Sequence, residues 1–365
     1  MFVELHLIQN FAPSNLNRDD TNNPKDCEFG GVRRARISSQ CIKRAIRFDP
    51  HFQQETGVSV SHRTKLMIDE LVKLMTASGM EKEEAQKRAQ LFAKHYSSKK
   101  GNLEKDNRTV VMLFLSQVEL QEIAARLIDI SDNEKEIKEL ANEIAKNNKN
   151  RPGAPDIAMF GRMLADRPET NLDAACQVAH AISTHRVNMD LDFFTAVDDL
   201  QPKEETGAGM MGVSGFNSAC FYRYAAIDFD QLVANLNGDV DLAKKTVQGF
   251  LYASVFAVPT GKQNSHAAQN PPSFLLAVVR RDGLCWSLAN AFEKPVYATT
   301  QKSLTEASIE ALDQYWGKLK DFYTNEALPV VACLDGESGL THLKEAQVDS
   351  LNKWVEAVAQ QLPQE

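Results

Sequence analysis

Polar and apolar residues alternate at the start of the chain, in FVELHLIQ, where Val3, Leu5 and Leu7 alternate with Glu4 and His6. A period of two residues is typical of a half-buried strand. The stretches RRARI, ACFYRYAAIDF, SFLLAVV, LCWSL and PVVACL also predict strands. The Arg-Arg-Asp-Gly between SFLLAVV and LCWSL is a turn signal, so we expect these two strands to form a hairpin.

Helical spacing appears elsewhere. From Ser39 onward, Ile42 and Ala45 fall on one helix face and Lys43 and Arg44 on the other. Charged amphipathic patterns fill residues 61–160, and helices are also expected over LDAACQVAHAIST, DLAKKTVQGFLYASVFA, TEASIEALDQYWGKL and KEAQVDSLNKWVEAVAQQL. The order strand, helix, strand, strand, helix, strand predicts an α+β, ferredoxin-like (RRM-like) fold that carries a large helical insertion.

These patterns divide the chain into five segments. Residues 1–60 and 219–365 form the two parts of the core, and residues 161–185 supply a helix that returns to it. Residues 61–160 are the helical insertion. Residues 186–218 are polar and rich in glycine, which predicts a long protrusion between two elements.

Charge narrows the choice of function. The chain has 41 basic and 49 acidic residues, a net charge of −8, which argues against indiscriminate coating of nucleic acid. A local basic groove is still compatible with this total, because counterion release depends on where the cations sit. The six cysteines form no CxxC pair, so neither a disulfide framework nor a zinc site is expected. Without a signal peptide or a membrane-length apolar run, we expect a soluble, cytoplasmic protein with no membrane partner.

The basic residues gather in GGVRRARISSQCIKRAIR, residues 30–47, which holds six Lys or Arg and no acidic residue. A strand leading into a helix places serine hydroxyls, an amide and backbone N–H groups at a helix start, which favours an anion. The alternative is a solvated basic face with an ordinary serine cap. No P-loop pattern is present. We therefore predict a site for an extended polyanion, made by Arg33, Arg34, Arg36, Ser38, Ser39, Gln40, Lys43, Arg44 and Arg47.

Other candidates have competing interpretations. Asp19, Asp20 and Asp26 could hold a metal for phosphodiester cleavage, but capping of turns and pairing with arginines are favoured, and no metal or cofactor is expected. His180 and His185 are five residues apart, a spacing that turns two rings away from each other on a helix, so structural roles are favoured.

Aromatic residues mark the protrusion. Phe193 and Phe194 could wedge between bases, or they could anchor the loop on the core. Met210 and Met211 would form an adaptable apolar tip.

Taken together, the motifs SNLNRDD, KDCEFGGVRRARISSQCIKRAIR, GRM, AHAISTH, DFFTAVDDL, FYRYA and LANAFEKPV resemble the CasC family. Its members are the repeated crRNA-binding backbone subunits of the type I-E CRISPR Cascade complex. The resemblance implies a palm, helical fingers (residues 61–160) and a thumb (residues 186–218). It also implies partners: crRNA, further copies in a helical filament, other Cascade subunits, and target DNA that pairs with the guide.

The resemblance extends to single residues. It implies backbone contacts to crRNA at Arg18, Lys25, Ser38, Gln40, Lys43, Arg44 and Met163. It implies a wedge that kinks the RNA at Phe193, Phe194, Thr195 and Val197. On this reading the protein has no catalytic residue. The rival is an RNA endonuclease of the same superfamily, using a loop aspartate to cut target RNA, or His180 or His185 to process repeat RNA.

Overall fold

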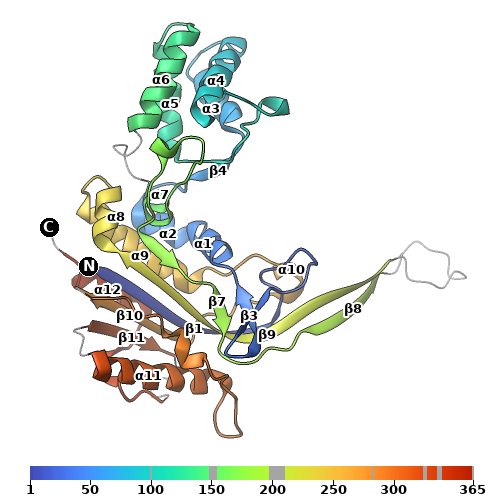
Figure 1. Ribbon diagram of the computed structural model, residues 1–365, viewed down its shortest axis with the longest axis vertical. Helices are drawn as coiled ribbons and strands as arrows, with labels where there is room; N and C mark the ends of the chain where they lie inside the picture. The colour runs from blue at the N-terminus through green and yellow to red at the C-terminus, as the bar shows by residue number, and fades with distance from the viewer. Residues whose placement is uncertain are drawn as a thin grey trace, which may run out of the picture. The chain divides into compact units, whose positions relative to one another are not determined.

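The computed structural model describes residues 1–98, 101–147, 154–196, 210–281, 283–323, 327–334 and 339–363 (Figure 1). The chain divides into two compact units. The first, called here the sheet unit, comprises Met1–Asp49, Val178–Ala226 and Phe250–Pro363. The second, the helical unit, comprises Pro50–Gln177 and Ile227–Gly249.

A large mixed sheet forms the sheet unit. Its strands are ordered β12-β11-β10-β1-β9-β7-β3-β2, and β6 and β8 pair with β9 off this path. Their bounds are β1 (Phe2–Ser14), β2 (Asp26–Phe29), β3 (Val32–Ile37), β6 (Cys176–Val178), β7 (Ala181–Ser183), β8 (Asp190–Ala196), β9 (Met210–Asp228), β10 (Phe274–Arg280), β11 (Ala327–Cys333) and β12 (Gln347–Val348). β10 runs antiparallel to β1 and to β11, whereas β12 is parallel to β11.

Helices pack against this sheet. The core joins Phe274 and Leu276 of β10 to Leu312 and Trp316 of α11, all of them buried. The helical elements are α1 (Ser39–Arg47), α10 (Gln263–His266), η4 (Leu288–Phe292), α11 (Leu304–Tyr323), η5 (Lys344–Ala346) and α12 (Leu351–Gln360). α9 (Val240–Phe256) contributes residues to both units.

The helical unit has a core of its own. Met67 and Leu71 of α3 are buried with Phe92 of α4, Ile123 of α5 and Leu140 of α6. Its elements are α2 (Pro50–Thr56), β4 (His62–Thr64), α3 (Met67–Ala77), α4 (Lys82–Ser97), η1 (Lys105–Asn107), β5 (Leu113–Leu115), α5 (Gln117–Asp129), α6 (Glu134–Lys146), α7 (Pro155–Phe160), η3 (Pro168–Thr170) and α8 (Phe229–Asn235). Of the helices in the described ranges, none has the length and apolar content that crossing a bilayer requires.

The mixed α+β class is confirmed, but the helix expected within residues 161–185 is wrong. LDAACQVAHAIST instead supplies β6 and β7. Ala181 and Ser183 are buried and Ile182 between them is half-buried, so the pattern fits a strand as well as a helix. β7 pairs with β3 on one side and β9 on the other, and these long-range hydrogen bonds decide the outcome.

The strand and hairpin expected at LCWSL are also wrong, because no strand is found over the described residues 283–288 and η4 begins at Leu288. Buried side chains accept hydrogen bonds from backbone N–H groups that would otherwise bond to a neighbouring strand. The N–H of Trp286 donates to the Glu4 carboxylate at 2.6 Å, and that of Leu288 donates to the Tyr222 hydroxyl at 2.8 Å. Glu4 also forms a buried ion pair with Arg280.

Candidate nucleic-acid interface

The start of α1 is where the predicted polyanion site centres. Ser38 caps the helix, because its hydroxyl accepts the N–H of Cys41. The N–H of Ser38 donates to Oδ1 of Asn17, and the N–H of Ser39 donates to Nδ1 of His180, both at 2.9 Å. The expectation of free backbone donors at this helix start is therefore wrong for these two residues, and any anion must be held mainly by side chains.

Besides Arg33, five cations around α1 are at least partly accessible. They come from the loop after β1, from β3 and from α1, and we call them the basic cluster: Arg18, Lys25, Arg36, Lys43 and Arg44. Gln40 is exposed on α1 one turn before Arg44, and Ser39 is half-buried. These residues therefore form a surface of charged and neutral donors, and their contact with RNA stays a prediction.

Two arginines of the stretch belong to the interior, so the expectation that they contact RNA is wrong. Arg34 is fully buried and donates to the backbone carbonyls of Phe29, Ser183, Phe292 and Glu293. Burial lowers the pKa of its guanidinium. Arg47, in the last turn of α1, is 4% exposed.

Acidic residues of β2 moderate the charge of β3. Arg33 is exposed, but it forms an ion pair with Asp26, and Glu28 lies directly opposite it in the strand register. Arg36 donates from Nε to the backbone carbonyl of Asp26 at 3.2 Å. Arg33 is thus partly neutralised within the chain by the acidic residues of β2.

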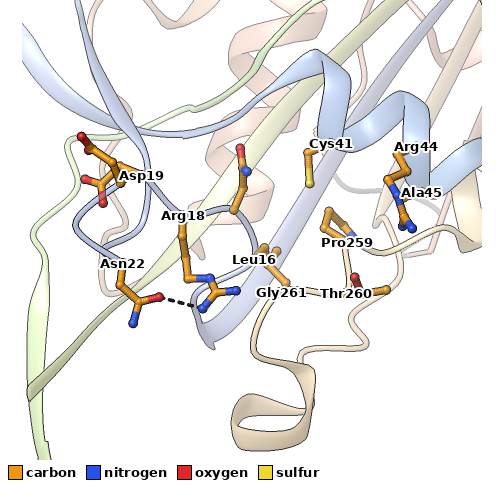
Figure 2. A pocket seen from close by; sticks show the side chains of 12 residues that line it. Leu16, Arg18, Asp19, Asn22, Cys41, Arg44, Ala45, Pro259, Thr260 and Gly261 are labelled. Atoms are coloured by element: carbon orange, nitrogen blue, oxygen red, sulfur yellow. Dashed lines mark hydrogen bonds between the residues drawn. The ribbon is translucent and has the colours of Figure 1, made fainter. Parts of the chain in front are cut away.

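A pocket of about 510 Å³ is lined by Arg18 and Arg44 of the basic cluster and by Asp19 and Asp20 (Figure 2). In Figure 2, Arg18 comes from the loop after β1 and Arg44 from α1, with Pro259 drawn between them. Arg18 donates to Oδ1 of Asn22 at 2.6 Å. The lining residues are Leu16, Asn17, Arg18, Asp19, Asp20, Asn22, Cys41, Arg44, Ala45, Pro259, Thr260 and Gly261.

Sequence reasoning missed the Pro259–Gly261 part of this pocket. A Cβ at Gly261 would lie 2.3 Å from the carbonyl oxygen of Leu16, so only glycine allows this loop to approach so closely. The Pro-Thr-Gly turn signal is visible in the sequence, but its position opposite Arg18 depends on the fold.

Asp19 has a structural task in the same loop. Its Oδ1 accepts the N–H and hydroxyl of Thr21 and the N–H of Asn23, at 2.8 to 3.0 Å. These hydrogen bonds, above all the one from the Thr21 hydroxyl, lower the pKa of Asp19. In the described part of the chain, no group of three or more His, Cys, Asp or Glu side chains is placed to hold a metal ion.

The two histidines also have defined hydrogen-bond partners. His185 is half-buried; its Nδ1 donates to the carbonyl of Arg186 at 2.8 Å, and its Nε2 accepts the N–H of Cys220 at 3.3 Å. Burial lowers its pKa. Both ring nitrogens therefore serve the fold. His180 is exposed, and its Nδ1 accepts the N–H of Ser39.

The protrusion is a two-stranded ribbon of β8 and the first part of β9. Phe193 lies opposite Val213, Phe194 opposite Gly212, Thr195 opposite Met211 and Ala196 opposite Met210. Phe193 is 64% exposed, so it is not an anchor packed on the core. Phe194, Met210 and Met211 are exposed as well. Val197, also predicted in the wedge, lies outside the described residues.

Met163 belongs to the helical unit, where it is 83% exposed. It lines a second pocket, of about 530 Å³, together with Arg63, Met112, Phe114 and Phe160. The guanidinium of Arg63 stacks over the ring of Phe114, 4.7 Å from its centroid. Met163 therefore belongs to a different unit from the basic cluster, which is part of the sheet unit.

Comparison with known proteins places the whole chain in one family. A solved structure described as "CRISPR RNA-guided surveillance complex, pre-nicking" holds a chain that is 31% identical, with a TM-score of 0.88 and 99% of each chain covered. A second, "CRISPR RNA-guided surveillance complex", gives 27% identity, a TM-score of 0.77 and the same coverage. No curated protein matches. The family of CT1975-like proteins, Cas_CT1975, matches residues 3–360, and the chain belongs to this family.

Proposed function

We propose that this protein is the crRNA-binding backbone subunit of a type I-E CRISPR Cascade complex, as its resemblance to the CasC family implies. The observation that carries the proposal is the match over 99% of both chains, at a TM-score of 0.88, to a chain of an RNA-guided surveillance complex. In this proposal the palm, related to the ferredoxin-like fold, lies mainly in the sheet unit, the fingers (residues 61–160) lie in the helical unit, and the β8–β9 ribbon belongs to the thumb (residues 186–218).

The basic cluster supports a grip on the RNA backbone. Lys and Arg side chains contact phosphates without reading bases, which suits a guide whose sequence changes. Five cations that each neutralise one phosphate of single-stranded RNA give a log–log salt slope of about −3.5 per copy, since each contributes about −0.7. The charge is concentrated because one polyanion lies against one face of an otherwise acidic protein.

The β8–β9 ribbon supports a wedge. Exposed phenylalanines and methionines on a narrow ribbon can insert between bases and unstack them at the cost of a few kcal/mol per step. Further copies of the chain, aligned along one crRNA with other Cascade subunits, would repeat this kink. The segments between kinks would then pair with target DNA.

This role requires no chemistry from the protein, and we propose that it is not an enzyme. Two groups that a nuclease would use already serve the fold. The Asp19 carboxylate holds its own loop, and both nitrogens of His185 have backbone partners.

The test is to incubate the purified protein with labelled single-stranded RNA and Mg²⁺ and to run native and denaturing gels in parallel. We expect a ladder of shifted species with RNA of full length. The double variant Lys43→Ala, Arg44→Ala should weaken binding equally for unrelated RNA sequences. Its matched control is Lys318→Ala, Lys320→Ala, two exposed lysines of α11. Shortened RNA, or a sequence-selective loss, would contradict the proposal.

A further inference from the structure

His180 occupies a position that the sheet register fixes. It directly precedes β7, whose Ala181 pairs with Ile37, the last residue of β3. This pairing brings the imidazole to the turn between β3 and α1, where its Nδ1 accepts the N–H of Ser39 at 2.9 Å. The ring is nevertheless exposed.

The hydrogen bond from Ser39 also fixes the tautomer of His180. A ring nitrogen that accepts an amide N–H carries no proton, so the proton of the neutral imidazole sits on Nε2. Partial burial, and then the charges of Arg36 and Lys25, lower the pKa of His180 and favour this neutral form. Within the described residues, the Nε2–H has no hydrogen-bond partner.

We propose that His180 is a further RNA-contacting residue, which donates its Nε2–H to a phosphate or ribose oxygen of the bound strand. The inference rests on the proposed function and adds a neutral donor to its basic cluster. Arg36 and Lys25, whose charges His180 senses, would hold the same stretch of backbone. Because the donor is neutral, it strengthens binding without releasing a counterion.

The experiment compares His180→Asn with His180→Gln in the full chain, using single-stranded RNA of unrelated sequences over a range of salt. Asn retains an acceptor where Nδ1 lies but offers no donor at the outer edge, whereas Gln reaches the position of Nε2. We expect His180→Asn to weaken binding about tenfold at every salt concentration, as for the loss of one hydrogen bond to a charged group. His180→Gln should retain more of the affinity.

Two further measurements separate this contact from a structural or a charged one. The salt slope of His180→Asn should equal that of the unchanged protein, whereas Arg36→Ala should reduce the slope by about 0.7. The affinity ratio of the unchanged protein to His180→Asn should stay constant from about pH 7.5 to about pH 8.5, because a ring whose pKa lies below 6.5 is neutral there. A ratio that grows toward the lower end of this range would overturn the assignment of a neutral donor.

If the unchanged protein binds RNA and His180→Asn binds equally well, the inference fails and the proposed function stands. Equal losses in both variants, in proportion to lost thermal stability without RNA, would show that His180 only holds α1 and would also overturn the inference. If the unchanged protein binds no RNA, the proposed function falls first and the inference with it.

Discussion

The ring of Phe194 lies against Gly212, its cross-strand partner in the β8–β9 ribbon. A Cβ at Gly212 would come within 2.5 Å of the ring, so the absence of a side chain allows the ring to lie over the opposite backbone. Phe194 is accordingly less exposed than Phe193, at 39% against 64%. The two phenylalanines therefore differ: Phe194 is supported by the ribbon, and Phe193 extends into solvent opposite Val213.

Gly212→Ala should displace the Phe194 ring and impair the wedge. We expect RNA affinity to change by less than about twofold, because the basic cluster is intact and supplies most of the binding free energy. The variant should unstack fewer bases. With 2-aminopurine placed in the RNA, the fluorescence increase that the unchanged protein causes on binding should be mostly lost. Ser214→Ala, two residues along the same strand face, is the control. Unchanged fluorescence in Gly212→Ala would argue against a wedge that depends on Phe194.

Arg34 and Arg36 lie two positions apart in β3, and we expect their substitution to affect different properties, stability for Arg34 and RNA binding for Arg36. Arg34→Ala removes a buried guanidinium and leaves several carbonyls without a donor, which should lower the free energy of unfolding by about 3 kcal/mol. Arg36→Ala should leave stability within about 0.5 kcal/mol and weaken RNA binding. Urea denaturation and RNA titration of both variants test this. An Arg34→Ala protein of normal stability with reduced RNA affinity would restore Arg34 to the interface.

The sequence pattern alone could not separate these two arginines. β1, β3, β10, β11, α1, α9 and α11 all appear where hydrophobic periodicity predicts them, because apolar side chains recur there with the period of a strand or a helix. β1 is nevertheless buried on both faces, Glu4 and His6 included, so the half-buried strand expected there is wrong. Arg34 breaks this logic. Its interior position is stabilised by carbonyls of Ser183, Phe292 and Glu293, about 150 or more residues away in the chain, which no local pattern records.

The two wrong secondary-structure predictions also result from contacts between residues far apart in the chain. β7 lies where helical spacing was expected, because its hydrogen bonds go to β3 and β9. The Trp286 segment is not a strand, because Glu4 takes its backbone N–H. In the candidate site, the resemblance identified the exposed cations, whereas the Pro259–Gly261 loop and the Ser39–His180 hydrogen bond became visible only in the fold.

Two substitutions of Asp19 can distinguish a structural role in its loop from a catalytic role. Asp19→Asn keeps an oxygen that can accept the hydrogen bonds from Thr21 and Asn23, but it removes the negative charge that metal-dependent cleavage would need. We expect RNA affinity and defence against a matching target to be retained. Asp19→Ala should loosen the loop that carries Arg18 and weaken RNA binding severalfold. Loss of defence in Asp19→Asn, with RNA binding preserved, would favour the nuclease alternative.

His6 should make the protein less stable as the pH falls. It is fully buried in β1, and its Nδ1 lies at hydrogen-bond distance, 2.9 Å, from the Tyr222 hydroxyl. Burial, followed by the charge of Arg280, lowers the pKa of His6 from 6.5 to about 3. Between pH 6.5 and about pH 3, His6 binds a proton in the unfolded chain but not in the folded chain, so lowering the pH favours unfolding.

The expected contribution is a loss of about 1.4 kcal/mol of unfolding free energy for each pH unit below about 6.5. His6→Asn keeps a polar group that can hydrogen-bond to the Tyr222 hydroxyl, but it cannot titrate. Its stability at neutral pH should be lower, because the smaller side chain leaves a cavity, but its dependence on pH should be flatter by that amount. Urea denaturation at several pH values between about 4.5 and 6.5 measures both slopes, and the other histidines cancel because both proteins contain them. Parallel curves would mean that His6 accepts a proton in the folded state, which the buried Arg280 opposes.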